Sequence, residues 1–144
     1  MAIASDCAVI DLEDYFGPWW DDPDATPAHK AAAEALLARV NALLEEAANN
    51  GIEMPKNPQT ASFVSGQNGG GFRPSSYPVG ALHSAHKEGR AVDVYDRGNA
   101  LDHWLNDRLL EEFGLYREHP TATPGWCHLT DRAPPSGKRT FSPR

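Results

Sequence analysis

Two histidines and one aspartate are the residues of this chain best suited to metal chemistry. His86 and Asp93 lie seven positions apart, and Asp93 falls inside the short apolar run 91–95. Such a run predicts a buried strand, in which an aspartate is costly unless a cation or hydrogen bonds compensate its charge. A second strand-like segment, 125–129, carries His128. Two histidines and one aspartate with a vacant fourth position are typical of a catalytic zinc site, since structural zinc sites are closed by four protein ligands.

The sequence around these residues resembles that of the M15 zinc peptidases. This family includes D-Ala-D-Ala carboxypeptidases, D,D-dipeptidases and phage L-alanyl-D-glutamate endopeptidases. Its pattern, S-x-H-x(6)-D followed by a C-terminal W-x-H, is matched by Ser84, His86, Asp93 and the segment 126–128. Residues 71–74 are similar to the family's G-[FY]-R segment, and the C-terminal tail is similar to that of small M15-like proteins of phages and prophages.

This resemblance implies that the chain binds Zn²⁺ through His86, Asp93 and His128. It also implies that the chain hydrolyses peptidoglycan stem peptides, as a carboxypeptidase or an endopeptidase. Two neutral imidazoles and one carboxylate leave a bound zinc ion with net positive charge, so that it can polarise a carbonyl and lower the pKa of water. The alternative is that Asp93 caps a turn and that the histidines are ordinary surface or core residues.

Arg73 and Ser84 are the residues expected to contact the substrate. The resemblance implies that Arg73 stabilises a developing oxyanion or holds a substrate carboxylate, two roles suited to its fixed fork of donors. The alternative is that Arg73 pins a loop through a salt bridge. The glycines at 69–71 are expected to let this arginine approach the site closely. Ser84 either donates to the substrate or caps the turn before His86, and His83 is expected at the rim of the cleft.

The general base is where the sequence departs from the family. Several M15 branches have Glu or Asp three residues before the last histidine, and this chain has Gly125 there. Glu118 and His119 are the nearest replacements, and both side chains can act as a base of tuned pKa. Glu118 is slightly preferred.

The missing acid keeps two non-catalytic alternatives open. One is a zinc-binding module that binds the cell wall, because the hedgehog signalling domain resembles this family and is a binding protein. The other is a virion structural protein that zinc stabilises. A fourth protein ligand, such as His83 or His119, would favour the structural alternative, whereas an open coordination position favours the enzyme.

Composition limits the class of protein. The 144 residues are expected to form one domain, 1–144, with an N-terminal helical part at 1–51 and a metal-site core at 60–143. The net charge of −7 argues against a nucleic-acid partner, because phosphate binding needs clustered Lys and Arg. No apolar run approaches the roughly 20 residues of a membrane span. The start lacks the features of a signal peptide. We therefore expect a monomer that is made in the cytoplasm and acts on the cell wall after release or as part of a virion.

The order of elements predicts an α+β fold, in which helices pack on a small antiparallel sheet, as in hedgehog and D,D-peptidase domains. Thr26 and Pro27 are typical of an N-cap and a first helical position, and apolar residues at three- and four-residue spacing predict a helix of about 22 residues after them. Alternation in the last strand places Cys127 in the core, away from His128. The other expected elements are strands at 91–95, 115–117 and 126–130 and a helix at 101–113.

Overall fold

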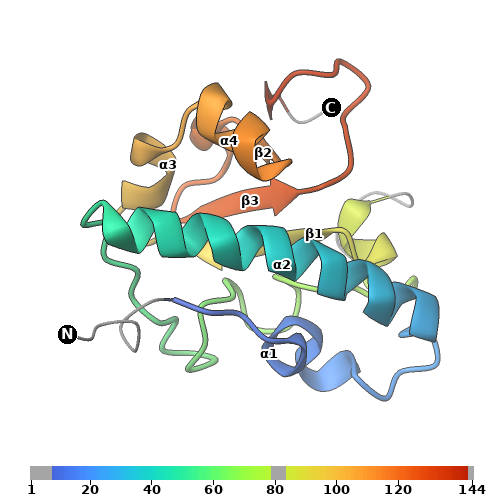
Figure 1. Cartoon of the computed structure of the whole chain (residues 1–144). Helices are drawn as coiled ribbons and strands as arrows, with labels where there is room; N and C mark the ends of the chain where they lie inside the picture. Colours follow the sequence, from blue (N-terminus) through green and yellow to red (C-terminus); the bar gives the residue numbers. More distant parts are fainter. Residues whose placement is uncertain (1–7, 79–83, 143–144) are drawn as a thin grey trace.

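The computed structural model describes residues 8–78 and 84–142, which form a four-stranded sheet with helices packed on it (Figure 1). β1 (Ala91–Tyr95) and β2 (Tyr116–Glu118) both pair antiparallel with β3 (Trp126–Thr130). β4 (Thr140–Phe141) pairs in parallel with β2, so the strand order is β1-β3-β2-β4. The expected α+β class is confirmed. The parallel edge strand β4 was not predicted, since a two-residue strand has no periodicity of its own.

The longest helix, α2 (Pro27–Asn49), lies across the sheet (Figure 1) and confirms the predicted helix. The Thr26 side chain accepts a hydrogen bond from the backbone N–H of His29, and Pro27 fills the first turn, where its missing N–H costs nothing. One stripe of the helix is buried, formed by Ala33, Leu36, Leu37, Val40, Leu43, Leu44 and Ala47. This stripe belongs to one core with Val92, Val94, Cys127 and Leu129 of the sheet.

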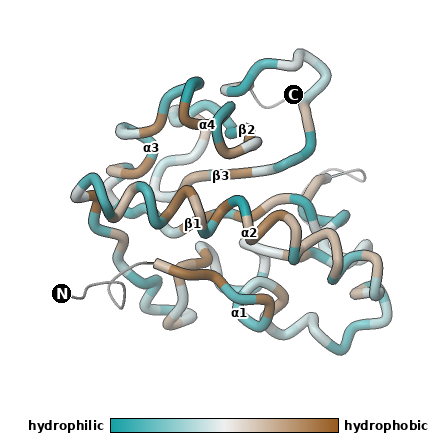
Figure 2. The backbone as a smooth tube through the Cα atoms, viewed as in Figure 1, coloured by the Kyte–Doolittle hydropathy of each residue, from teal (hydrophilic) through white to brown (hydrophobic). Residues whose placement is uncertain are grey.

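In Figure 2, brown hydrophobic stretches lie in α1, α2 and β3, whereas the outer loops are mostly teal and therefore hydrophilic. α1 (Leu12–Phe16) is capped by Asp11, whose side chain accepts a hydrogen bond from the backbone N–H of Asp14. The buried Tyr15 hydroxyl donates to the backbone carbonyl of Ala91, 2.8 Å away. The N-terminal part is thereby fixed to the strand that carries Asp93.

The prediction of a single helix at 101–113 is wrong. The structure has two short helices there, α3 (Ala100–Trp104) and α4 (Asp107–Phe113). Leu105 is extended, and the Asn106 side chain accepts a hydrogen bond from the backbone N–H of Leu109 at 2.9 Å. Asparagine is among the best N-cap residues, so Asn106 starts a new helix where the hydrophobic spacing alone predicts continuation.

The outer edge of β1 is covered by the glycine-rich segment 63–70. Val64 forms an isolated bridge with Val94, and the backbone N–H of Ser65 donates to the carbonyl of Asp93 at 2.7 Å. The backbone N–H of Asp93 donates in turn to the carbonyl of Gly70 at 2.6 Å. These bonds satisfy an edge that would otherwise be unpaired, and they bring the glycine-rich segment beside Asp93.

Candidate metal centre

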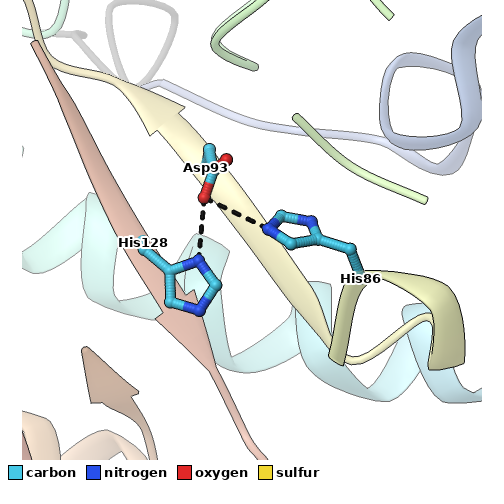
Figure 3. Close-up of side chains that lie close together, drawn as sticks. All are labelled: His86, Asp93 and His128. Atoms are coloured by element: carbon cyan, nitrogen blue, oxygen red, sulfur yellow. Dashed lines mark hydrogen bonds and ion pairs between the residues drawn. The ribbon is translucent and has the colours of Figure 1, made fainter. Parts of the chain in front are cut away.

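Three elements bring His86, Asp93 and His128 together (Figure 3). Asp93 and His128 are direct partners in the ladder of β1 and β3, and His86 lies on the short helix η3 (Ala85–Glu88), which precedes β1. Asp93 Oδ1 lies 2.9 Å from His128 Nδ1 and 3.4 Å from His86 Nε2. One ligand atom of each residue lies within 4.8 Å of the other two.

These separations fit a metal ion. Zinc bonds of 2.0–2.2 Å in tetrahedral geometry place ligand atoms about 3.3–3.5 Å apart. The distance from Asp93 Oδ1 to His86 Nε2 already has this value, and that to His128 Nδ1 is a few tenths of an ångström shorter. The group could therefore hold a metal ion, as the sequence predicts for these three residues.

His86 is held in the orientation that a ligand needs. Its side chain is buried, and its Nδ1 lies 2.8 Å from the backbone carbonyl of Gly71. A carbonyl can only accept, so Nδ1 carries a proton, and Nε2 is the ring nitrogen that faces Asp93 and is available to bind a metal. Such a second contact fixes the tautomer and the ring of metal-binding histidines. The Ser84 hydroxyl accepts from the backbone N–H of His86 at 3.2 Å, which places Ser84 as the cap of η3.

Gly71 is a site residue that the sequence analysis did not identify in this role. A Cβ atom on Gly71 would collide with the backbone carbonyl of Tyr15, and one on Gly70 with that of Ser65. The glycines are therefore required for close backbone approach. The expectation that they serve Arg73 covers only part of their function, because the carbonyl of Gly71 also orients His86.

Asp93 and His128 perturb each other's ionisation. Burial by itself raises the pKa of Asp93, but the neighbouring His86 and His128 outweigh burial and hold it well below its usual value. Burial lowers the pKa of His128, but the hydrogen bond and the charge of Asp93 raise this pKa by more than burial lowers it. The net shift is therefore upward. The carboxylate is thus ionised, and a cation is favoured at the position where it meets the imidazoles.

Arg73 makes the loop contact that the sequence left open and also lies beside Asp93 in the cleft. Its Nε donates to the backbone carbonyl of Gly69 at 2.6 Å, which ties down the glycine-rich segment. One of its terminal nitrogens lies 3.6 Å from Asp93 Oδ2, the carboxylate oxygen that does not face the histidines. Arg73 also lines the cleft over the site. It therefore pins a loop and presents positive charge beside the metal centre.

A cleft of about 670 Å³ opens over this face of the sheet. The ladders align Tyr116 with Thr130 and Arg117 with Leu129, so the next position places Glu118 beside His128. Phe141 pairs with Glu118 in β4, and its ring centroid lies 6.2 Å from that of His128. Asp93, His128, Glu118 and Phe141 thus form one row across the floor of the cleft, with one residue from each strand.

The two candidates for the general base lie in different places. Glu118 lines the cleft, and its charge contributes to the raised pKa of His128. His119 is exposed, and its Nδ1 contacts the Thr121 hydroxyl at 2.8 Å at the start of the short helix η4 (Pro120–Ala122). His119 is not among the residues that line the cleft. His83 lies outside the described residues.

Gly125 precedes β3 with φ of +96°. Side chains other than glycine rarely adopt this conformation, so the backbone itself disfavours an acid here.

Beneath the cleft, Arg117 anchors the strand that carries Glu118. Its guanidinium donates to the backbone carbonyl of Asp102 at 2.7 Å, and its Nε donates to the Thr140 hydroxyl at 3.1 Å. The Asp102 side chain is fully buried and also lies 3.3 Å from the same guanidinium. This buried pair links β2 to α3 and β4. No local sequence pattern predicts this pair. Alternation along the strand indicates only that Arg117 and Glu118 face opposite sides of the sheet.

No protein-family model, no curated protein and no solved structure matches the chain in the three comparisons made with known proteins. Among the helices that the structure describes, none has the length and apolar character needed to cross a membrane.

Proposed function

We propose that this protein is a zinc-dependent peptidase of M15 type, of phage or prophage origin, that hydrolyses peptidoglycan stem peptides as a carboxypeptidase or an endopeptidase. The observation that carries the proposal is the row of Asp93, His128 and Glu118 on the floor of one cleft. It places a carboxylate outside the ligand set directly beside a metal-binding group. We further propose a monomer that is made in the cytoplasm and reaches the cell wall after release or within a virion.

Zinc is the metal that the donor set favours. Imidazole nitrogens and a carboxylate oxygen are good zinc ligands, and a set of three is the pattern of catalytic sites. When bound, zinc supplies a Lewis acid that polarises the scissile carbonyl and makes water more acidic. The Gly71 carbonyl behind His86 and the Arg73 guanidinium behind Asp93 then act as the outer contacts that orient two of the three ligands.

The remaining chemistry is assigned to residues of the cleft. Glu118 takes a proton from the attacking water and delivers it to the leaving amine, since one carboxylate can serve as base and then as acid. Arg73 donates to the oxyanion that develops on the carbonyl oxygen, or holds a carboxylate of the substrate. Ser84 lines the cleft as well, although its hydroxyl already accepts from the backbone of His86.

A non-catalytic zinc-binding module that binds the cell wall is the second candidate. The observation in its favour is Gly125, which leaves the family's acid position without a carboxylate. A virion structural protein stabilised by zinc would need no base at all. The position of Glu118 supports the enzyme over both alternatives, because it sets a carboxylate beside the metal site and within the cleft.

The test is to incubate the purified, zinc-loaded protein with defined muropeptides and to identify products by mass spectrometry. Release of an amino acid or peptide that requires zinc and Glu118 supports the peptidase, and the product masses name the bond. Tight binding of muropeptides without any product favours the binding module. Stable zinc with neither binding nor cleavage favours the structural protein.

A further inference from the structure

Arg73 reaches the cleft from a segment that is neither helix nor strand, so contacts between side chains must hold its guanidinium in place. An arginine side chain loses much rotamer entropy when it is fixed in one position. The hydrogen bond to the carbonyl of Gly69 fixes Nε, and the ion pair with Asp93 has a length of 3.6 Å, longer than a hydrogen bond. A further contact of the guanidinium is therefore important for its position.

A tyrosine ring supplies this contact. The guanidinium carbon of Arg73 lies over the ring of Tyr77, 5.4 Å from the ring centroid. An arginine is attracted to the face of an aromatic ring within about 6 Å of its centroid. Tyr77 is not among the residues that line the cleft, whereas Arg73 is. The ring therefore contacts the guanidinium from outside the cleft.

The Tyr77 ring is itself held by groups from two parts of the chain. Its hydroxyl oxygen lies over Gly69, where any Cβ atom would collide with it. The ring of Trp19, which ends the short helix η2 (Gly17–Trp19), meets the Tyr77 ring edge to face, with centroids 6.2 Å apart. Trp19 Nε1 also donates to the backbone carbonyl of Asn68 at 2.6 Å. The short helix and the glycine-rich segment thus hold this ring in place.

We infer that Tyr77 is a positioning residue, which keeps the Arg73 guanidinium at the cleft through a cation–π contact. The inference rests on the proposed function of Arg73 and deepens it, because it adds a residue that acts without touching the substrate. It also explains Gly69, since only glycine leaves room for the tyrosine hydroxyl. Through Trp19, the N-terminal part of the chain contributes to the site.

The strength of the contact determines how often the guanidinium occupies its position at the cleft. Tyr77→Leu keeps an apolar side chain but removes the ring face, and it should lower kcat/KM by about fivefold, within the range of cation–π contacts. Tyr77→Phe keeps the ring face and should remain near the wild-type value.

A double-mutant cycle tests whether Tyr77 acts through Arg73. In the Arg73→Gln background, Tyr77→Leu should have no further effect on kcat/KM for a muropeptide, because effects of residues that act as a unit do not add. Phe63→Leu is the matched control. It removes a ring that lies under Lys56, with 5.8 Å between the ammonium and the ring centroid, and neither residue is among those that line the cleft. This variant should leave kcat/KM unchanged.

A second measurement follows Arg73 without any substrate. Phenylglyoxal modifies the guanidinium groups of arginines, and peptide mapping by mass spectrometry gives the rate at each position. The Arg73 side chain is 15% exposed, so it should react slowly in the wild type and in Tyr77→Phe, and faster in Tyr77→Leu. Arg108 of α4, with a side chain that is 77% exposed, is the internal reference and should react at the same rate in all variants.

Zinc content and melting temperature show whether each variant is folded. If Tyr77→Leu does not fold, Tyr77→trifluorophenylalanine takes its place, because fluorine weakens the negative face of the ring and nearly preserves its shape. This variant should change both measurements in the same direction as Tyr77→Leu.

Three results would overturn the inference: an unchanged kcat/KM in Tyr77→Leu, an equal loss in Tyr77→Phe, or losses that add in the double variant. The test of hydrolysis is separate. A protein that cleaves muropeptides with a kcat/KM independent of Tyr77 refutes the positioning role alone. A protein in which the reactivity of Arg73 depends on Tyr77, but which releases no product, refutes the peptidase alone, and muropeptide affinity then replaces kcat/KM in the cycle.

Discussion

Asp93 of β1 and His128 of β3 face each other across the antiparallel ladder, with Oδ1 and Nδ1 2.9 Å apart. The same carboxylate oxygen lies 3.4 Å from His86 Nε2 (Figure 3). One oxygen atom therefore gathers two imidazoles from different elements, while the other oxygen lies 3.6 Å from Arg73. Two imidazole nitrogens and one carboxylate oxygen therefore lie close enough together to share a metal ion.

We expect one zinc ion per chain, bound by this group. Elemental analysis of protein purified without added metal should show near-stoichiometric zinc, and the His86→Ala, His128→Ala double variant should lose it. His103→Ala is the matched control, because His103 is an exposed histidine of α3. Zinc should also raise the melting temperature of the wild type. At a hundredfold excess of zinc over Kd, the free energy of unfolding should increase by about 2.7 kcal/mol. Undiminished zinc in the double variant would remove these histidines from the site.

Gly71→Ala should weaken both the fold and the metal site. The new methyl group would collide with the Tyr15 carbonyl and displace the Gly71 carbonyl that orients His86. We expect a loss of about 1–3 kcal/mol in the free energy of unfolding, the usual cost of overpacking, together with weaker zinc binding. Gly98→Ala provides the control, because a Cβ atom at Gly98 meets no atom within 4 Å. Chemical denaturation and zinc titration measure the two effects, and equal behaviour of the two variants would contradict the assignment.

The sequence could predict the elements that have strong periodicity or clear caps. The helix after Thr26 and the strands that carry Asp93 and His128 lie where expected, because their apolar patterns coincide with good capping residues or with a buried face. The split at Asn106 could not be predicted from hydrophobic spacing, since α3 and α4 share one apolar pattern and only the cap separates them.

The site was predictable to the extent that it depends on side chains in a motif. The three ligand candidates come together, and Glu118 lies in the cleft while His119 does not. The contribution of Gly71 was missed because it acts through a backbone carbonyl, which has no signature in the residue type. The pairing of Arg117 with Asp102 was missed because it joins β2 to α3, two elements whose contact no local pattern specifies.

Arg73→Lys should keep zinc and most of the fold but lose much of the activity. A lysine retains the charge near Asp93, but its ammonium cannot reproduce a fork that donates to Gly69 and faces the cleft at once. We expect kcat to fall by about tenfold or more, because a donor to developing charge acts in the transition state. Zinc content, melting temperature and steady-state kinetics give the three readouts. A variant that unfolds would show that the contact with Gly69 is the main function of Arg73.

The metal-free protein should have a window of pH in which the pair of Asp93 and His128 stabilises it most. The pKa of Asp93 is lowered, so its contribution is present above the ordinary value of 3.8 and is lost as the pH falls. The pKa of His128 is raised, so its contribution is full below the ordinary value of 6.5 and is lost as the pH rises through the raised value. Both contributions are therefore present between about pH 4 and 6.5.

Thermal unfolding of chelator-treated wild type and Asp93→Asn, measured across this range, checks the window. The difference in melting temperature should be largest inside it and smaller on either side. Added zinc should move the optimum upward, because neutral imidazole is the form that binds metal. A difference that does not vary with pH would show that the pair does not ionise as described.

Glu118→Gln should keep zinc and lower turnover by about a hundredfold or more, the usual range for the loss of a general base. The substitution preserves the shape of the side chain in the row beside His128 and removes its negative charge and its ability to take up a proton. His119→Ala is the natural comparison, since His119 is exposed and contacts Thr121 outside the cleft; it should have little effect. Rates of muropeptide cleavage at saturating zinc give the measurement. If His119→Ala alone loses activity with zinc retained, the base is His119, and the loop after β2 must move when the substrate binds.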